Sequence, residues 1–334
     1  MLLLKSIIIL IVGFVLLIKG ADFFVEGSSA VAKRLRIPSM IIGMTIVAMG
    51  TSLPECAVSV TASLTGNNTL AISNAIGSNI FNLLVVCGVC TLFVPLAVQK
   101  STLQKEFPLS IFCAGLLLLL GYLSMTLGHI DGIILIIIFA GYLLWMIQSA
   151  RNARNQTFAD EDSDTAGSRT SLSAEEIEQV ASNINLLPAW KCIIFILGGM
   201  IAIKYGGDFV VNGASAIASS LGLSQTLIGL TIIAMGTSLP ELVTSIVAAK
   251  KDEVDMAVGN VIGSNIFNIL LVLGVAAAIS PVGFIMENMI DIAFLILISV
   301  ITLVFAWTSK EINRKEGIIM LLLYAVYMVY ICMR

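Results

Sequence analysis

The chain has 334 residues, of which 58% are hydrophobic and only 12% are charged, with a mean hydropathy of +1.02 and a net charge of −3. A soluble domain carries about 25% charged residues, so this composition excludes a soluble globular protein and indicates one that crosses a membrane several times. Because there is one histidine, and the six cysteines lie mostly in apolar runs, a zinc or iron–sulfur site is not expected.

About 20 apolar residues cross a bilayer as a helix, and ten such runs follow one another along the chain. One polar segment, 151–187, interrupts them and carries the acidic run 160–164, with a capping box from Ser173 to Glu176 that predicts a short helix. We therefore expect an all-α polytopic membrane protein with ten transmembrane helices. The predicted helices lie near residues 2–32, 37–64, 69–97, 106–127, 130–150, 188–219, 222–249, 255–282, 287–307 and 313–333.

The basic residues predict how these helices are oriented. Of the 18 Lys and Arg residues, 14 lie in the connections after the odd-numbered helices, and the connections after helices 2, 4, 6 and 8 hold none. By the positive-inside rule, the N-terminus lies outside and the 151–187 loop lies in the cytoplasm, in a multi-pass protein of the plasma (inner) membrane. With five helices in each half, the second half begins on the opposite side, so the halves 1–150 and 188–334 form inverted repeats joined by the linker 151–187.

Two motifs of the first half return in the second half at a constant spacing of 186 residues. The segment GMTIVAMGTSLPE at 43–55 returns as GLTIIAMGTSLPE at 229–241, and NAIGSNIFN at 74–82 returns as NVIGSNIFN at 260–268. The motif regions are thus 43–82 and 229–268. Inverted repeats with duplicated motifs are typical of transporters whose binding site lies at the midplane, where the halves meet.

Each motif pair places a carboxylate, Glu55 or Glu241, near the middle of an apolar helix. An ionised group there costs about 2.5–3.5 kcal/mol, so a purely structural role is the weaker alternative. Two such carboxylates repel each other unless a cation lies between them, and one divalent cation neutralises both. Pro54 and Pro240 interrupt the same helices and free backbone carbonyls, which are good ligands for sodium or calcium.

Further oxygen atoms surround the two carboxylates in the sequence. Hydroxyl residues lie within one helical turn before each glutamate, and the helices that follow each present a polar face with four-residue spacing. Because every predicted ligand is an oxygen, the site favours hard cations such as sodium, calcium and potassium over zinc or copper. For a single serine or asparagine, packing between helices is the alternative role. The residues are Thr51, Ser52, Thr237 and Ser238, followed by Asn74, Ser78, Asn82, Asn260, Ser264 and Asn268.

GTSLPE followed by GSNIFN, present twice, resembles the two alpha-repeats of the calcium:cation antiporter superfamily, and within it the prokaryotic sodium/calcium exchanger family. The resemblance covers nearly the whole chain and implies ten helices in two inverted five-helix repeats. Some members carry aspartate at the position of Asn268, so here the resemblance implies two titratable carboxylates and places potassium transport in doubt. The metal ligands that it implies are Glu55, Glu241, Thr51, Ser52, Thr237, Ser238, Ser78, Asn82, Ser264 and Asn268, with the backbone of Ala48 and Ala234.

The expected function is that of a secondary active antiporter, not an enzyme, which exchanges calcium for sodium across the plasma membrane by alternating access. Its expected partners are calcium ions, sodium ions and the bilayer, with no cofactor, no nucleic acid and no obligate protein partner. A calcium/proton antiporter of the same fold is the main alternative, and a passive cation channel is a more distant one. For Asp22 and Asp208, a further repeat pair, both ion pairing and a role in the ion pathway remain open.

Overall fold

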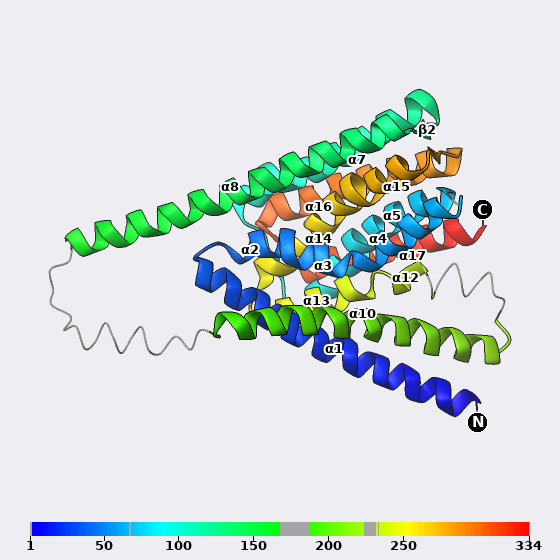
Figure 1. Cartoon of the computed structure of the whole chain (residues 1–334), viewed down its shortest axis with the longest axis horizontal. Coiled ribbons are helices and arrows are strands. Elements are labelled where there is room, and N and C mark those ends of the chain that lie inside the picture. Colours follow the sequence, from blue (N-terminus) through cyan, green and yellow to red (C-terminus); the bar gives the residue numbers. More distant parts are fainter. Residues whose placement is uncertain (1, 67, 168–186, 224–231, 233, 334) are drawn as a thin grey trace.

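The computed structural model describes residues 2–66, 68–167, 187–223, 232 and 234–333, and helices make up nearly all of this part of the chain (Figure 1). Among the described residues, eight helices are long and apolar enough to cross a membrane, and a ninth span consists of the bent pair Ser39–Thr51 and Leu53–Leu64. The predicted helix 222–249 falls partly outside the described residues, and α13 (Leu239–Lys250) is its main described part. Both chain termini lie at the same end of the molecule in Figure 1.

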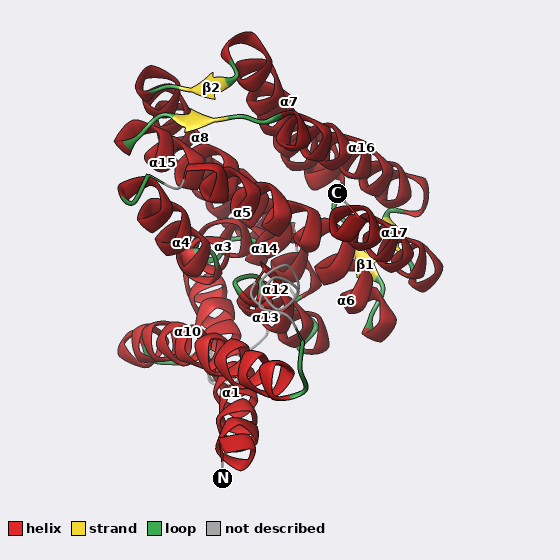
Figure 2. Cartoon of the chain, turned by 90° about the vertical axis from the view of Figure 1, so that its right-hand side faces the viewer, coloured by secondary structure: helices red, strands yellow, loops and turns green. Residues whose placement is uncertain are grey.

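Two short antiparallel strand pairs lie at the ends of the long helices (Figure 2). Each pair joins a strand of the first half to a strand of the second, β1 with β4 and β2 with β3. The long elements are α1 (Leu2–Leu35), α7 (Phe107–Ser124), α8 (His129–Gly167), α10 (Ala189–Ser220), α16 (Met286–Ser309) and α17 (Arg314–Met333). The strands are β1 (Leu96–Ala97), β2 (Thr126–Leu127), β3 (Val282–Gly283) and β4 (Glu311–Ile312).

Two equivalent spans form the centre of the molecule. In each, an α-helix passes through one π-helical turn into a second α-helix. In the most apolar 18-residue stretch of these two spans, 72% and 78% of the residues are buried, against 28% in α1 and in α10. Each π-helical turn begins at an asparagine that the sequence predicts to be a ligand. The central elements are α5 (Asn68–Phe81), η2 (Asn82–Val86) and α6 (Cys87–Phe93), and α14 (Val254–Phe267), η5 (Asn268–Val272) and α15 (Leu273–Ile279).

Helices α1 and α10 pack against each other as a pair, apart from the main bundle (Figure 2). They run antiparallel, since Gly13 of α1 lies beside Gly206 and Gly27 lies beside Cys192. A Cβ atom on Gly20 would lie 2.8 Å from the backbone nitrogen of Ile203, so the backbones approach too closely for any larger residue. At these glycines the two backbones are in direct contact, and the rings of Phe23 and Phe195 pack beside them, 5.1 Å apart.

Helix α8 is longer than the sequence predicts. The apolar run predicts a helix near 130–150, but α8 continues to Gly167, through the acidic run 160–164 and into the polar segment. This extension projects beyond the rest of the bundle in Figure 1. Hydropathy marks where a helix leaves the apolar phase, not where it ends, which explains the difference. The short helix predicted at Ser173 to Glu176 lies outside the described residues.

Candidate cation site

The site is built where the second predicted helix breaks. This span consists of α2 (Ser39–Ile42), the π-helical η1 (Gly43–Val47), α3 (Ala48–Thr51) and α4 (Leu53–Leu64), and it bends by 47° between α3 and α4. Ser52 forms the junction with φ −85° and ψ 11°, and Pro54 lies at the start of α4. Proline cannot donate to the preceding turn, so the helix restarts there and Glu55 lies in its first turn.

The second half repeats this geometry. Helix α12 (Ala234–Gly236) ends before Ser238, whose φ of −94° and ψ of 6° match the junction of the first half, and α13 starts with Pro240 and Glu241 in its first turn. The helix interruption expected at the two prolines is therefore present in both copies, whereas the freed carbonyls remain a prediction. Residues 229–231 and 233 of this motif lie outside the described residues, and so does the side chain of Ala234, the first residue of α12.

The two glutamates are fully buried, and each is bonded to the other half of the chain. Ser52 Oγ donates to Glu241 Oε1 at 2.8 Å, and Ser238 Oγ donates to Glu55 Oε1 at 3.1 Å. Among the described residues, the second oxygen of each carboxylate has no hydrogen-bond partner, and no basic side chain pairs with either glutamate. A buried carboxylate oxygen without a partner is costly, so this pair is poised to accept positive charge.

Asparagines of the central helices bond to one another across the two halves. Asn82 Nδ2 donates to Asn265 Oδ1 at 3.2 Å, and Asn268 Nδ2 donates to Asn79 Oδ1 at 3.1 Å. Asn79 and Asn265 also donate to each other's backbone carbonyls, at 3.1 and 3.3 Å. These bonds use the amide nitrogens of Asn82 and Asn268 and leave their Oδ1 atoms buried without a partner in the described part of the chain. The result is two amide oxygens held in fixed directions.

Asn74 and Asn260 brace the helices that carry the glutamates. Asn74 Nδ2 donates to Glu55 O at 3.2 Å and to Ser59 Oγ at 3.0 Å. Asn260 Nδ2 makes the equivalent bonds to Glu241 O at 3.4 Å and to Ser245 Oγ at 2.9 Å. Both residues were expected on the polar faces, and the contacts show that their amide nitrogens fix the backbone beside each carboxylate.

The remaining predicted residues lie around the same centre. Ser78 Oγ lies 3.4 Å from Glu55 Oε1 and 3.0 Å from Ser238 Oγ. Thr51 Oγ1 donates to Asn260 Oδ1 at 3.1 Å. Ser264 Oγ donates to Ala48 O at 3.5 Å, so the backbone of α3 also reaches the centre.

Thr237 has a buried Oγ1 with no hydrogen-bond partner among the described residues, although the residue as a whole is only half-buried. Apart from Ala234, whose backbone carbonyl has no contact in the described part of the chain to place it at this centre, the structure brings the predicted ligands of both halves into one buried polar region with Glu55 and Glu241. Their role as ligands remains a prediction.

The sequence interpretation missed Asn79 and Asn265. Both belong to the repeated GSNIFN motif, but each lies one residue off the face formed by the predicted ligands. Their duplication was the available signal, and it did not reveal that each residue contacts the other half of the chain. In this site they position Asn82 and Asn268.

The donor set fits a hard cation carried as substrate. Within the described ranges, no group of three or more His, Cys, Asp and Glu side chains is arranged to hold a metal ion. The site instead offers two carboxylates together with hydroxyl, amide and carbonyl oxygens. Such ligands suit sodium and calcium, and two carboxylates match the charge of one divalent or two monovalent cations.

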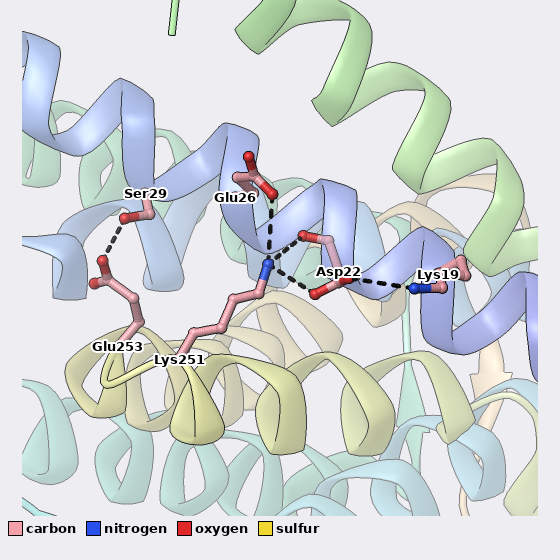
Figure 3. Close-up of polar contacts among 6 residues, drawn as sticks. All are labelled: Lys19, Asp22, Glu26, Ser29, Lys251 and Glu253. Carbon is pink, nitrogen blue, oxygen red and sulfur yellow. Dashed lines mark hydrogen bonds and ion pairs between the residues drawn. The ribbon is translucent and has the colours of Figure 1, made fainter. Parts of the chain in front are cut away.

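Ion pairs bridge α1 to the C-terminal end of α13 (Figure 3). Lys251 Nζ lies 2.7 Å from Asp22 Oδ1 and 3.6 Å from Glu26 Oε2, and it also donates to the backbone carbonyl of Asp22 at 3.1 Å. About two turns after Asp22 on α1, Ser29 donates to Glu253. Asp22 therefore ties the peripheral helix pair to the main bundle.

In the second half, Asp208 pairs with Lys204 of its own helix at 2.8 Å. Both residues line a cavity of about 310 Å³, which Pro54, Thr237 and Pro240 also line. This cavity thus extends to a predicted ligand and to both helix breaks. The ion pairing expected as one role of the two aspartates is present in both, but with different partners.

The fold and the site define a polytopic membrane protein with a buried oxygen site between two similar halves. The model of the sodium/calcium exchanger protein family matches residues 5–148 and 191–333. The chain therefore belongs to this family, whose members are transporters. It is 39% identical to the putative antiporter CaxA of Alkalimonas amylolytica, over 97% of this chain and 98% of that protein.

Two further similar proteins are named as sodium/calcium exchangers, and one of them has a solved structure. The sodium/calcium exchanger MaX1 of Methanosarcina acetivorans is 30% identical over 97% of both chains. The solved structure of the sodium-calcium exchanger NCX_Mj soaked with Na⁺ and Sr²⁺ matches with a TM-score of 0.80 at 30% identity, over 98% of this chain and 99% of that one. This chain is thus a cation antiporter by family and by fold.

Proposed function

We propose that the protein exchanges calcium for sodium across the plasma membrane by alternating access. The observation that carries the proposal is the pair of buried glutamates, each bonded to a serine of the opposite half and each with one oxygen left without a partner. One calcium ion, or two or more sodium ions, would bind between them in place of those hydroxyl donors. The names of the relatives MaX1 and NCX_Mj support these two ions.

The proposed architecture is ten transmembrane helices in two inverted five-helix repeats. The antiparallel packing of the equivalent helices α1 and α10 supports inversion, as do the reciprocal bonds of Asn79 and Asn265 and the two matched strand pairs. An even number of crossings agrees with both termini lying at one end (Figure 1). We place that end outside, and the end with Lys251 and the segment 151–187 in the cytoplasm, from the distribution of basic residues.

Coupling follows from electrostatics in this scheme. Two ionised carboxylates at low dielectric repel strongly, so rearrangement of the empty site is costly, and a bound calcium ion or set of sodium ions removes this cost. The α1–α10 pair, which packs apart from the main bundle, would move across it and expose the site on alternate sides. The sodium gradient would then drive calcium out of the cell.

The test is calcium-45 uptake into proteoliposomes with imposed sodium, potassium or proton gradients. An outward sodium gradient should drive calcium uptake, whereas a proton or potassium gradient should not. Uptake driven by protons alone would favour the calcium/proton antiporter. Downhill flux without stimulation by a counter-ion would instead indicate a passive channel.

A further inference from the structure

A groove on the bundle surface lies between the corner that joins α1 to α2 and the middle of α8. Its volume is about 400 Å³. The site described above shares no residue with it. One wall includes Leu35, Ile41 and Thr45, and the other includes Leu143, Ile147 and Ala150.

The walls of this groove suit a hydrocarbon chain and not a polar ligand. The hydroxyl of Thr45 donates to Ile41 O at 2.6 Å, so it is turned back onto its own helix. On α8, Ile147 is 51% exposed, so it presents a large apolar surface outside the bundle. An apolar groove on the membrane-facing side of a helix bundle is in contact with lipid.

Arg151 and Arg154 line one end of the groove, and both are exposed. Together with Leu143, Ile147 and Ala150 they follow helical spacing, so the apolar stripe of α8 continues directly into a basic one. No Asp or Glu is among the described residues that line the groove. The last turn of α1, next to Leu35, adds Lys33 and Arg34. Positive charge thus gathers where the apolar groove reaches the membrane surface.

We propose that this groove binds an anionic phospholipid, with an acyl chain between α2 and α8 and the phosphate at Arg151 and Arg154. Arginine recognises phosphate by paired hydrogen bonds, and basic clusters at the end of an apolar helix attract anionic lipids. Under the proposed topology this end faces the cytoplasm, where anionic lipid attracts such clusters. The bound lipid would link α8 to the corner of α1, one of the two helices proposed to move.

The experiment is native mass spectrometry of the full-length protein, titrated with phosphatidylglycerol or with phosphatidylcholine of the same acyl chains. Each basic residue near a membrane surface contributes a factor of about five in affinity for anionic lipid. We expect phosphatidylglycerol to bind about 25-fold more tightly than phosphatidylcholine, and R151Q/R154Q to remove that difference. R151K/R154K, which keeps both charges, should retain most of it. Ala150→Trp, which fills the groove beside the arginines, should weaken both lipids.

The matched control is R314Q/K315Q, which removes two charges from exposed positions at the start of α17. It should keep the preference for phosphatidylglycerol. Equal affinity for the two lipids, or the same loss in both double variants, would overturn the proposal. Displacement of the lipid by inorganic phosphate at equal concentration would also overturn it, since the groove would then be only an anion site. Lipid binding is measured without transport, so this outcome is independent of the proposed exchange.

Discussion

Asp22 and Asp208 occupy equivalent positions in the two halves, yet their surroundings differ. Asp22 of α1 lies 4.0 Å from Lys19 of its own helix and also pairs with Lys251, the residue after α13, so contacts between separate helices join that end of the molecule. Asp208 of α10 is paired only within its own helix among the described residues, and it lines a cavity that extends to Thr237. The centre of the site is nearly symmetric while its two ends are not.

Under the proposed alternating access, this difference suggests how two halves with nearly identical motifs could give one open and one closed side. An inverted repeat makes two arrangements of the ends nearly equal in energy, and a few contacts select one of them. In the proposed scheme, the bridge between α1 and Lys251 would favour closure at that end. The following predictions test the symmetric centre first and the asymmetric ends afterwards.

The largest effect is expected at the centre. Glu55→Gln or Glu241→Gln should lower calcium transport at least about a hundredfold, because each removes one of the two charges that neutralise a buried cation. The fold should persist, since glutamine still offers an oxygen to the serine of the opposite half. Calcium-45 flux and size-exclusion chromatography measure the two properties. Glu287→Gln, an exposed position on α16, is the control, and more than half of the flux retained in either site variant would contradict the assignment.

The identity of the closed end depends on the topology. A cysteine introduced as Ser163→Cys should react with a membrane-impermeant thiol reagent only after the cells are opened. This expectation follows from the basic residues, which predict that segment 151–187 lies in the cytoplasm. Cys332, which is exposed near the C-terminus, must first be replaced so that the background is silent. Ready labelling in intact cells would reverse the two ends, so the Lys251 bridge would then close the external side.

A more moderate change is expected for Asn268→Asp. Asn268 Nδ2 donates to Asn79 Oδ1, so an ionised aspartate would place two acceptors face to face, whereas a protonated one would restore the bond. The variant should behave like the wild type at low pH and lose about tenfold in flux, or require potassium, as the pH rises toward 9.

Flux over roughly pH 6 to 9, with and without potassium, measures this effect, and Asn82→Asp is the symmetric comparison. If the pH and potassium profiles of the variant overlay those of the wild type, Asn268 does not set the charge of the site. The same conclusion would follow if the wild type already required potassium.

The smallest effect is expected at the ends themselves. Lys251→Gln should raise hydrogen–deuterium exchange in the last turns of α13 about fivefold, because a partly exposed ion pair contributes about 1 kcal/mol. Lys204→Gln removes an equal charge from a pair confined to one helix and should leave exchange at both ends unchanged. A similar rise in the two variants would mean that the Lys251 bridge does not hold that end closed.

The sequence alone determined the membrane class, the positions of most spans and the chemistry of the site. The effects of hydropathy and of proline depend on neighbouring residues in the sequence. The apolar runs and the helix breaks at Pro54 and Pro240 can therefore be predicted without knowing the tertiary contacts. The duplicated glutamates were recognisable because an ionisable group within an apolar run is rare and costly.

Only the tertiary structure decided how the two halves meet. Asn79 and Asn265 are hydrogen-bonded although 186 residues separate them in the sequence. No local sequence pattern predicts which other residue a polar side chain of this kind contacts. The π-helical turns at Asn82 and Asn268 also lie within uninterrupted apolar runs that give no local sign of them. Likewise, equivalent aspartates acquire different partners because a single lysine, Lys251, lies at the end of α13, and its reach to α1 is a property of packing.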